Sequence, residues 1–138
     1  MARYYEELEH TADWTIRVWG ASLDRLFANA AGAMFEMQGA DLAAQPVHNH
    51  WVHCRAGDLE ALLIAWLNEL LFLSETQNAL YTRFQVRIEP ARRGFELEAD
   101  VRGLAGRGPL AHIKAVTYWD LAVRPTDSGW EATVTFDT

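Results

Sequence analysis

The sequence predicts an α+β fold in which two helices pack on a largely antiparallel β-sheet, within a single domain that spans residues 1–138. The length suits one domain, because typical domains hold about 100 to 150 residues. Half of the residues are apolar and 22% are charged, so the chain can bury a core. Segments with a period of two lie before, between and after two segments of helical period, an order that favours α+β architecture.

The first regular segments are a strand and an amphipathic helix. Apolar and polar residues alternate over residues 14–19, with Ile16 and Val18 on one face, and Gly20 ends this predicted strand. Ser22 then suits the N-cap of a helix whose apolar residues recur at spacings of three and four. These apolar residues are Leu23, Leu26, Phe27, Ala30, Met34 and Met37.

A second strand and a second helix follow. Residues 47–55 are predicted to form a strand, and Asp58 suits the N-cap of a helix that runs to about Leu73. The apolar face of this helix is broad, so we expect it to be deeply buried. Its apolar residues include Leu59, Leu62, Leu63, Trp66, Leu67, Leu70 and Leu71.

Two hairpins complete the predicted sheet. Apolar and polar residues alternate in residues 81–89 and 95–102, on either side of a turn at 90–94, and the polar face sets arginines opposite carboxylates. The last hairpin pairs residues 120–124 with 130–136 around a turn of Thr, Asp, Ser and Gly. Hairpins pair neighbouring strands antiparallel, so the sheet should be largely antiparallel.

The charge balance excludes some classes of partner. The chain has 12 basic and 19 acidic residues, a net charge of −7. Affinity for nucleic-acid phosphates comes mostly from clustered Lys and Arg, so we expect no direct nucleic-acid binding. The most apolar stretch, residues 59–73, is interrupted by acidic residues and is shorter than the roughly 20 residues that span a bilayer, so we expect no membrane association.

The sequence also predicts where the protein resides. Residues 1–10 lack the apolar core of a signal peptide. The single cysteine, Cys54, has no partner for an intrachain disulfide, which fits a reducing compartment. We therefore expect a cytoplasmic protein, and the sequence leaves its oligomeric state open.

Two short acidic segments are candidate ligand sites. The polar tetrapeptide His10-Thr11-Ala12-Asp13 directly precedes the strand predicted over residues 14–19, at a strand junction that suits ligands, although the residues alone favour local Asx or ST turns. Asp137 and the α-carboxylate of Thr138 follow the last strand. Two adjacent negative groups can form a hard oxygen site for Mg²⁺, Mn²⁺ or Ca²⁺, especially beside a third carboxylate. A solvated terminus is the alternative.

Lys114 is the single lysine of the chain. The chain contains eleven arginines and one lysine. A compact ammonium can make a phosphate contact that a planar guanidinium makes differently, so the retained lysine hints at such a role. Chance retention of a single lysine is the alternative.

Two further patterns carry weaker signals. His48, His50 and Cys54 share one face of their predicted strand, and two imidazoles with a thiolate can hold zinc or copper. The glycines between Gly103 and Gly108 match neither the P-loop nor the dinucleotide fingerprint, so we interpret this segment as a loop.

Four segments, in this order, resemble the archease family over essentially the whole chain. They are Glu9-His10-Thr11-Ala12-Asp13, Trp66-Leu67-Asn68-Glu69-Leu70-Leu71, Ile113-Lys114-Ala115-Val116-Thr117-Tyr118 and Phe136-Asp137-Thr138. The resemblance implies a non-catalytic accessory protein of the tRNA-splicing RNA ligase, which joins a 2′,3′-cyclic phosphate or 3′-phosphate end to a 5′-hydroxyl. It further implies that the protein promotes guanylylation and multiple turnover of this ligase and binds a divalent cation, Ca²⁺, Mg²⁺ or Mn²⁺.

The resemblance also implies roles for individual residues. The family's metal ligands fall on Asp13, Asp137 and Thr138, and its functional lysine falls on Lys114, with Asp13 and His10 in the same activating set. The chain departs from the family pattern where it has Thr15, Ala65, Trp119 and Thr138. None of these departures removes a carboxylate from the implied metal site.

Two other functions remain open at this point. One is an independent metal-dependent phosphoesterase, because carboxylates and a lysine would serve that chemistry too. The other is a chaperone-like module that modulates a tRNA-modifying enzyme through exposed aromatic side chains.

Overall fold

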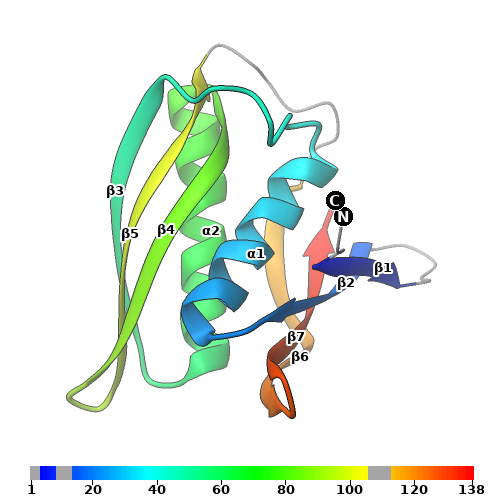
Figure 1. Ribbon diagram of the computed structural model, residues 1–138, viewed down its shortest axis with the longest axis vertical. Helices are drawn as coiled ribbons and strands as arrows, with labels where there is room; N and C mark the ends of the chain where they lie inside the picture. The colour runs from blue at the N-terminus through cyan, green and yellow to red at the C-terminus, as the bar shows by residue number, and fades with distance from the viewer. Residues whose placement is uncertain (1–3, 9–13, 106–112) are drawn as a thin grey trace.

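The structure is a computed structural model and describes residues 4–8, 14–105 and 113–138. Over these residues the chain forms two helices and seven strands (Figure 1). The elements are β1 (Tyr5–Leu8), β2 (Trp14–Gly20), α1 (Leu23–Met37), β3 (His48–Ala56), α2 (Leu59–Gln77), β4 (Ala79–Ala91), β5 (Gly94–Ala105), β6 (Ala115–Thr126) and β7 (Gly129–Asp137). The predicted α+β class is confirmed.

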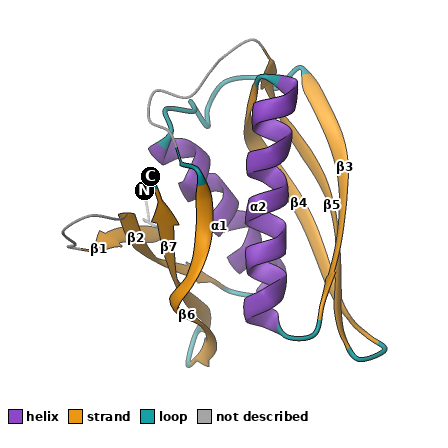
Figure 2. Cartoon of the chain, turned by 180° about the vertical axis from the view of Figure 1, so that it is seen from behind, coloured by secondary structure: helices purple, strands orange, loops and turns teal. Residues whose placement is uncertain are grey.

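The strands form two antiparallel sheets, where the sequence predicted one. One sheet has the order β1-β2-β7-β6, and the other has the order β3-β5-β4. Both helices lie between the sheets (Figures 1 and 2). Helix α1 contacts β2 and β4, and helix α2 contacts β3 and β6. Because each helix packs against both sheets, apolar side chains are needed around much of its circumference, which explains the broad apolar face of α2.

Both predicted helix starts are confirmed. The Ser22 hydroxyl accepts a hydrogen bond from the amide of Arg25 (3.1 Å), and the Asp58 carboxylate accepts one from the amide of Ala61 (2.7 Å). These bonds satisfy amides that the first helical turn leaves free. Helix α2 continues four residues past the predicted end, to Gln77. Among the described residues, neither helix is long and apolar enough to cross a membrane.

The core lies around the helices, and its largest side chains are aromatic. Trp66 of α2 is fully buried, and its indole Nε1 donates a hydrogen bond to the carbonyl of Phe27 in α1 (2.9 Å). Its ring also meets that of Phe84 in β4 edge-on, at a centroid distance of 6.3 Å. One side chain thus connects both helices and the three-stranded sheet.

Each helix also reaches an edge strand through an acidic residue in its first turn. The Asp24 carboxylate of α1 accepts a hydrogen bond from the amide of Ile88 in β4 (2.8 Å). The Glu60 carboxylate of α2 accepts one from the amide of Val123 in β6 (2.9 Å). Strands β4 and β6 are edges of their sheets, so these carboxylates satisfy amides that no strand pairs.

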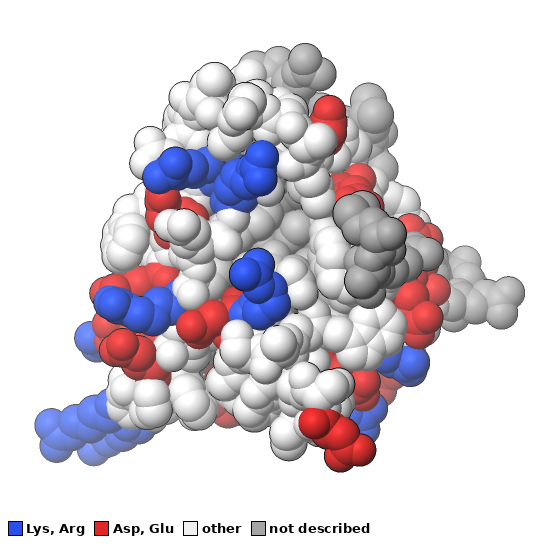
Figure 3. Space-filling view, in the orientation of Figure 1, with Lys and Arg blue, Asp and Glu red and all other residues white. Residues whose placement is uncertain are grey.

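The outer face of the three-stranded sheet carries ion pairs. Arg87 lies opposite Glu98 and contacts it at 2.8 Å, as the predicted hairpin pairing requires. At Arg83 that expectation is wrong, because its cross-strand partner is Arg102, after a register shift in β4. Basic and acidic side chains lie interspersed on the face shown in Figure 3.

Strand β6 is longer than predicted and is interrupted. The pairing of β6 with β7 shifts register between Thr117 and Ala122, and Asp120 has a φ of 54°. Within this bulge, Tyr118 and Trp119 are 63% and 69% exposed. The bulge breaks the alternation of buried and exposed residues, so the pattern predicted only the part of β6 after it.

Cys54 should resist modification in the folded protein. Its thiol is buried, and burial, with a smaller contribution from the charge of Glu69, raises its pKa to about 11 from 9.0. At pH 8 the thiolate is the reactive form and is scarce, so we expect the folded chain to react with an aromatic disulfide reagent at least about tenfold more slowly than the unfolded chain. Equal rates in buffer and in denaturant would contradict this.

The same thiol predicts a pH dependence of stability. The unfolded chain loses the thiol proton near pH 9, while the folded chain keeps it until about pH 11. The proton is therefore bound more tightly in the folded state, and stability falls as the pH rises through this window. In Cys54→Ala this contribution is absent, so the free energy of unfolding should fall less between pH 8 and pH 10.5 than in the unmodified chain. Urea unfolding at both pH values measures the difference.

Candidate functional site

Two charged residues that the sequence singled out lie side by side at one end of the four-stranded sheet. Ala115, the first residue of β6, pairs with Asp137, the last residue of β7. The preceding amide, of Lys114, donates a hydrogen bond to the carbonyl of Asp137 at 2.8 Å. Both side chains are exposed, as is Thr138. This strand end therefore presents a cation, a carboxylate and the last residue of the chain to solvent.

Strand β2 begins at the same end of the sheet. Trp14, its first residue, pairs with Phe136 of β7. The other predicted site residues, His10 and Asp13, lie outside the described residues. The structure thus brings together Lys114 and Asp137.

Two buried or half-buried amide side chains hold the backbone around Lys114. The amide of Ile113 donates to the side-chain carbonyl of Gln38 at 3.4 Å, and the amide of Val116 donates to that of Asn68 at 2.9 Å. Gln38 is itself 2% exposed and donates to the carbonyl of Met34 (3.3 Å). The segment that carries Lys114 is therefore anchored to the end of α1 and to the middle of α2.

Sequence analysis did not find this anchoring role. Asn68 lies in one of the segments that resemble the family, but the sequence does not show that its side chain accepts a hydrogen bond from the amide of Val116. Gln38 was missed altogether. The signal that could have found both residues is a polar amide side chain within or next to an apolar helix. Where such a side chain is buried, it needs a hydrogen-bond partner.

A cavity of about 430 Å³ lies beside this segment. Lys114 and Ile113 form part of its wall, and Phe72 and Glu75 of α2 form another part. Phe72 is 58% exposed and adds apolar surface to this wall. The site thus combines an ammonium group, carboxylates and an apolar surface, a combination suited to a polar ligand or to a protein segment.

One departure from the family pattern has a structural explanation. Thr15 of β2 lies opposite Thr135 of β7, and their hydroxyls are 3.1 Å apart and buried. A cross-strand hydroxyl pair satisfies both polar groups and stabilises the strand pairing next to the site. Trp119, another departure, is an exposed residue of the β6 bulge.

The weak metal-site signal of His48, His50 and Cys54 does not correspond to a site in the structure. The three side chains share the inner face of β3, and the rings of His48 and His50 are 5.0 Å apart. Residues four apart in a strand are separated by about 13 Å, however, so Cys54 lies too far from His50 for a common ion. Over the part of the chain that the structure describes, the metal-competent group is instead His53 with Glu96 and Glu98.

The structure is that of a small α+β protein with a strand-end site, where Lys114 and Asp137 lie side by side at the start of β6 and the end of β7. The chain belongs to the archease protein family, since the model of the Archease protein family (MTH1598/TM1083) matches residues 5–138. The resemblance expected from the four sequence segments is thereby confirmed.

Similar proteins support this assignment over nearly the full length. The protein archease of Methanosarcina mazei is 36% identical over 141 residues, covering 96% of this chain and 94% of that protein. The protein archease of Methanopyrus kandleri is 33% identical over 137 residues, covering 96% and 98%.

Two solved structures have the same fold. The solution structure of Methanobacterium thermoautotrophicum protein 1598 has a TM-score of 0.85 and 30% identity, covering 98% of this chain and 99% of that one. The crystal structure of an archease from Thermotoga maritima, described as a possible chaperone, has a TM-score of 0.67 and covers 96% of each chain. At 22% identity, this second likeness concerns the fold alone.

Proposed function

We propose that this chain is an accessory protein of the tRNA-splicing RNA ligase that joins 2′,3′-cyclic phosphate or 3′-phosphate ends to 5′-hydroxyls. It promotes guanylylation and multiple turnover of the ligase and performs no covalent chemistry itself. The observation that carries the proposal is the backbone hydrogen bond from Lys114 to Asp137, which joins two of the family's functional positions at one strand end. The match to the archease family over residues 5–138 supports it.

The proposal includes a divalent cation, Ca²⁺, Mg²⁺ or Mn²⁺, held by Asp13, Asp137 and the α-carboxylate of Thr138. These donors are hard oxygens, which such cations prefer. Two observations support the fit: the side chain of Asp137 is exposed, and Trp14, which follows Asp13 in sequence, pairs with Phe136, which precedes Asp137. When bound, the cation offsets negative charge on phosphate groups brought to this end of the protein.

Lys114 would act as the cationic contact for the ligase. Its side chain is exposed, while Gln38 and Asn68 hold the backbone on either side of it. A group whose backbone is already ordered loses less conformational freedom on binding. The ammonium can then donate charge-assisted hydrogen bonds to a phosphate or a carboxylate of the ligase. His10 joins this set on the strength of the family resemblance.

A chaperone-like role with another protein partner is the second candidate. The Thermotoga maritima archease is described as a possible chaperone. Phe72 beside the Lys114 cavity, and Tyr118 and Trp119 in the β6 bulge, are exposed apolar surface of the kind that binds proteins. Both candidates share a non-enzymatic accessory role, and they differ in whether the ligase responds.

A ligation time course with RNA in large excess over ligase tests the proposal. With this protein present, each ligase molecule should join many substrates; without it, product should stop near one equivalent of ligase. Identical time courses would refute ligase activation and leave the chaperone-like role as the better account. The protein alone should release no phosphate from phosphoesters with Mg²⁺ or Mn²⁺, and turnover there would instead indicate a phosphoesterase.

Asp137→Asn should weaken cation binding by at least about tenfold, because the substitution removes one anionic oxygen donor and keeps the shape of the side chain. Calorimetric titration with Ca²⁺ and Mn²⁺ measures this. Asp127→Asn is the matched control, because Asp127 is an exposed acid in the turn at the opposite end of the same hairpin. Equal losses in both variants would mean that nonspecific charge, not a site, attracts the ion.

A further inference from the structure

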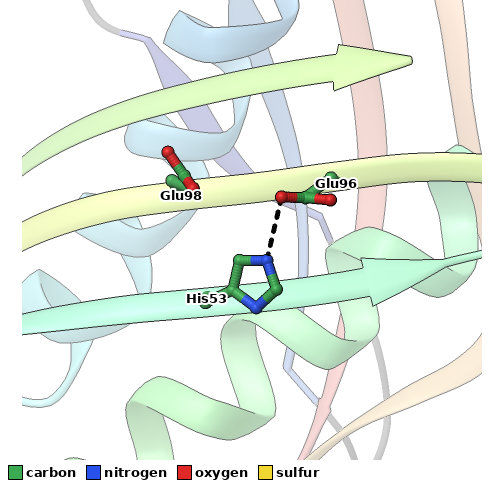
Figure 4. Close-up of side chains that lie close together, drawn as sticks. All are labelled: His53, Glu96 and Glu98. Carbon is green, nitrogen blue, oxygen red and sulfur yellow. Dashed lines mark ion pairs between the residues drawn. The ribbon is translucent and has the colours of Figure 1, made fainter. Parts of the chain in front are cut away.

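An imidazole and two carboxylates meet on the outer face of the three-stranded sheet, on β3 and β5 (Figure 4). We propose that His53, Glu96 and Glu98 bind a divalent transition-metal ion, with Zn²⁺ as the best match. This site is separate from the strand end that holds Asp137, and it does not depend on the proposed function.

The strand register creates the cluster. His53 of β3 lies directly opposite Glu98 of β5, and Glu96 lies two residues before Glu98, so all three side chains point to the same face. One ligand atom from each residue lies within 4.8 Å of the others. Side chains brought together by paired strands need little ordering before they bind an ion.

The closest pair already has a spacing that suits zinc. Nε2 of His53 and Oε1 of Glu96 are 3.1 Å apart, joined by a dashed line in Figure 4. Two donors about 2.0–2.1 Å from a tetrahedral zinc ion are about 3.3–3.4 Å apart. An ion between them therefore needs small movements of these two side chains, and a larger one of the Glu98 carboxylate.

The donor set determines the class of metal. An imidazole nitrogen with carboxylate oxygens suits Zn²⁺ and its neighbours among the transition metals, whereas the oxygen donors proposed at Asp137 suit Ca²⁺ and Mg²⁺. Glu96 and Glu98 supply the carboxylate oxygens, and His53 supplies the nitrogen.

Two arginines compete for the same carboxylates. Arg55 contacts Glu96 at 3.2 Å, and Arg87 contacts Glu98 at 2.8 Å. Both guanidinium groups are largely exposed, so releasing them to solvent costs little. Because Arg55 competes with the metal for Glu96, removal of Arg55 should strengthen metal binding. This expected result distinguishes a metal site from a network of ion pairs.

Titration of the full chain with Co²⁺, followed by displacement with Zn²⁺, tests the proposal. Co²⁺ bound by nitrogen and oxygen donors at low coordination number gives visible absorption bands, which six-coordinate Co²⁺ in water nearly lacks. We expect a saturable band that Zn²⁺ abolishes, at least about tenfold weaker binding in His53→Ala and in Glu98→Gln, and about threefold tighter binding in Arg55→Ala.

Two further variants locate the ion. Asp137→Asn should leave the band unchanged, because its carboxylate belongs to the other site. Glu89→Gln is the matched control and should also leave the band unchanged. Glu89 is an exposed acid on the same sheet that also contacts Arg87. The proposal is overturned by any of three results: no saturable band in the unmodified chain, a band that His53→Ala preserves, or weaker binding in Arg55→Ala. Far-UV circular dichroism should show that every variant, all with changes at the surface, remains folded.

Discussion

Replacing Lys114 with alanine should reduce multiple-turnover ligation at least about tenfold, a loss of about 1.4 kcal/mol in binding or activation free energy. The exposed ammonium is the proposed contact with the ligase, and truncation removes its charge-assisted hydrogen bonds. Stability should change by no more than about 0.5 kcal/mol, because the side chain is at the surface and the hydrogen bond to Asp137 uses the backbone amide. Product formed per ligase, measured beside urea unfolding, separates the two effects.

Two companion variants make this result specific. Lys114→Arg keeps the charge but replaces a compact ammonium with a planar group, so it should recover only part of the activity. Arg124→Ala removes a cation from the far part of the same strand, where Arg124 pairs with Glu131 at 3.1 Å, and activity should stay unchanged. Full activity of Lys114→Ala would remove Lys114 from the proposed mechanism.

Replacing Trp66 with alanine should lower the free energy of unfolding by about 3–5 kcal/mol. The side chain is fully buried, connects α2 to α1 through the 2.9 Å bond to Phe27, and packs against Phe84. Its loss leaves a cavity where the helices and the three-stranded sheet meet. Trp66→Phe keeps most of the apolar volume but not the hydrogen bond, so it should cost less than Trp66→Ala.

Urea unfolding followed by circular dichroism measures both losses, with Phe72→Ala as the control. Phe72 lies in the same helix but is 58% exposed, so truncation there should cost less than about 1 kcal/mol. If Trp66→Ala cost no more than Phe72→Ala, the packing of α2 between the two sheets would be wrong.

Local features of the fold could be predicted from the sequence, and the division into two sheets could not. The N-caps Ser22 and Asp58 are recognised by their own side chains and by the helical period that follows. Pairing between β2 and β7 joins residues 14–20 to 129–137. A strand has the same alternation whichever sheet it enters, so periodicity contains no information about this pairing.

The candidate sites also depend on contacts between residues far apart in the sequence, which the sequence pattern does not show. Lys114 and Asp137 were recognised by residue type and by family resemblance, but the amide anchors of Gln38 and Asn68 act across 75 and 48 residues of sequence. The cluster around His53 depends on the register of β3 against β5, which no single strand reveals. Within β3 alone, the metal-ligand pattern indicated His48 and His50, which lie on the face opposite to His53.

The carboxylates of Asp24 and Glu60 bear on how the protein avoids self-association. An edge strand with free amides can pair with the edge of another molecule and start aggregation. Here one edge of each sheet has an amide already bonded to a helix, Ile88 in β4 and Val123 in β6. In β6 the bulge adds a second obstacle, because it disrupts the regular spacing that an incoming strand requires. The helices therefore do more than fill the core: their first turns make an open sheet edge a poor template for a neighbouring chain.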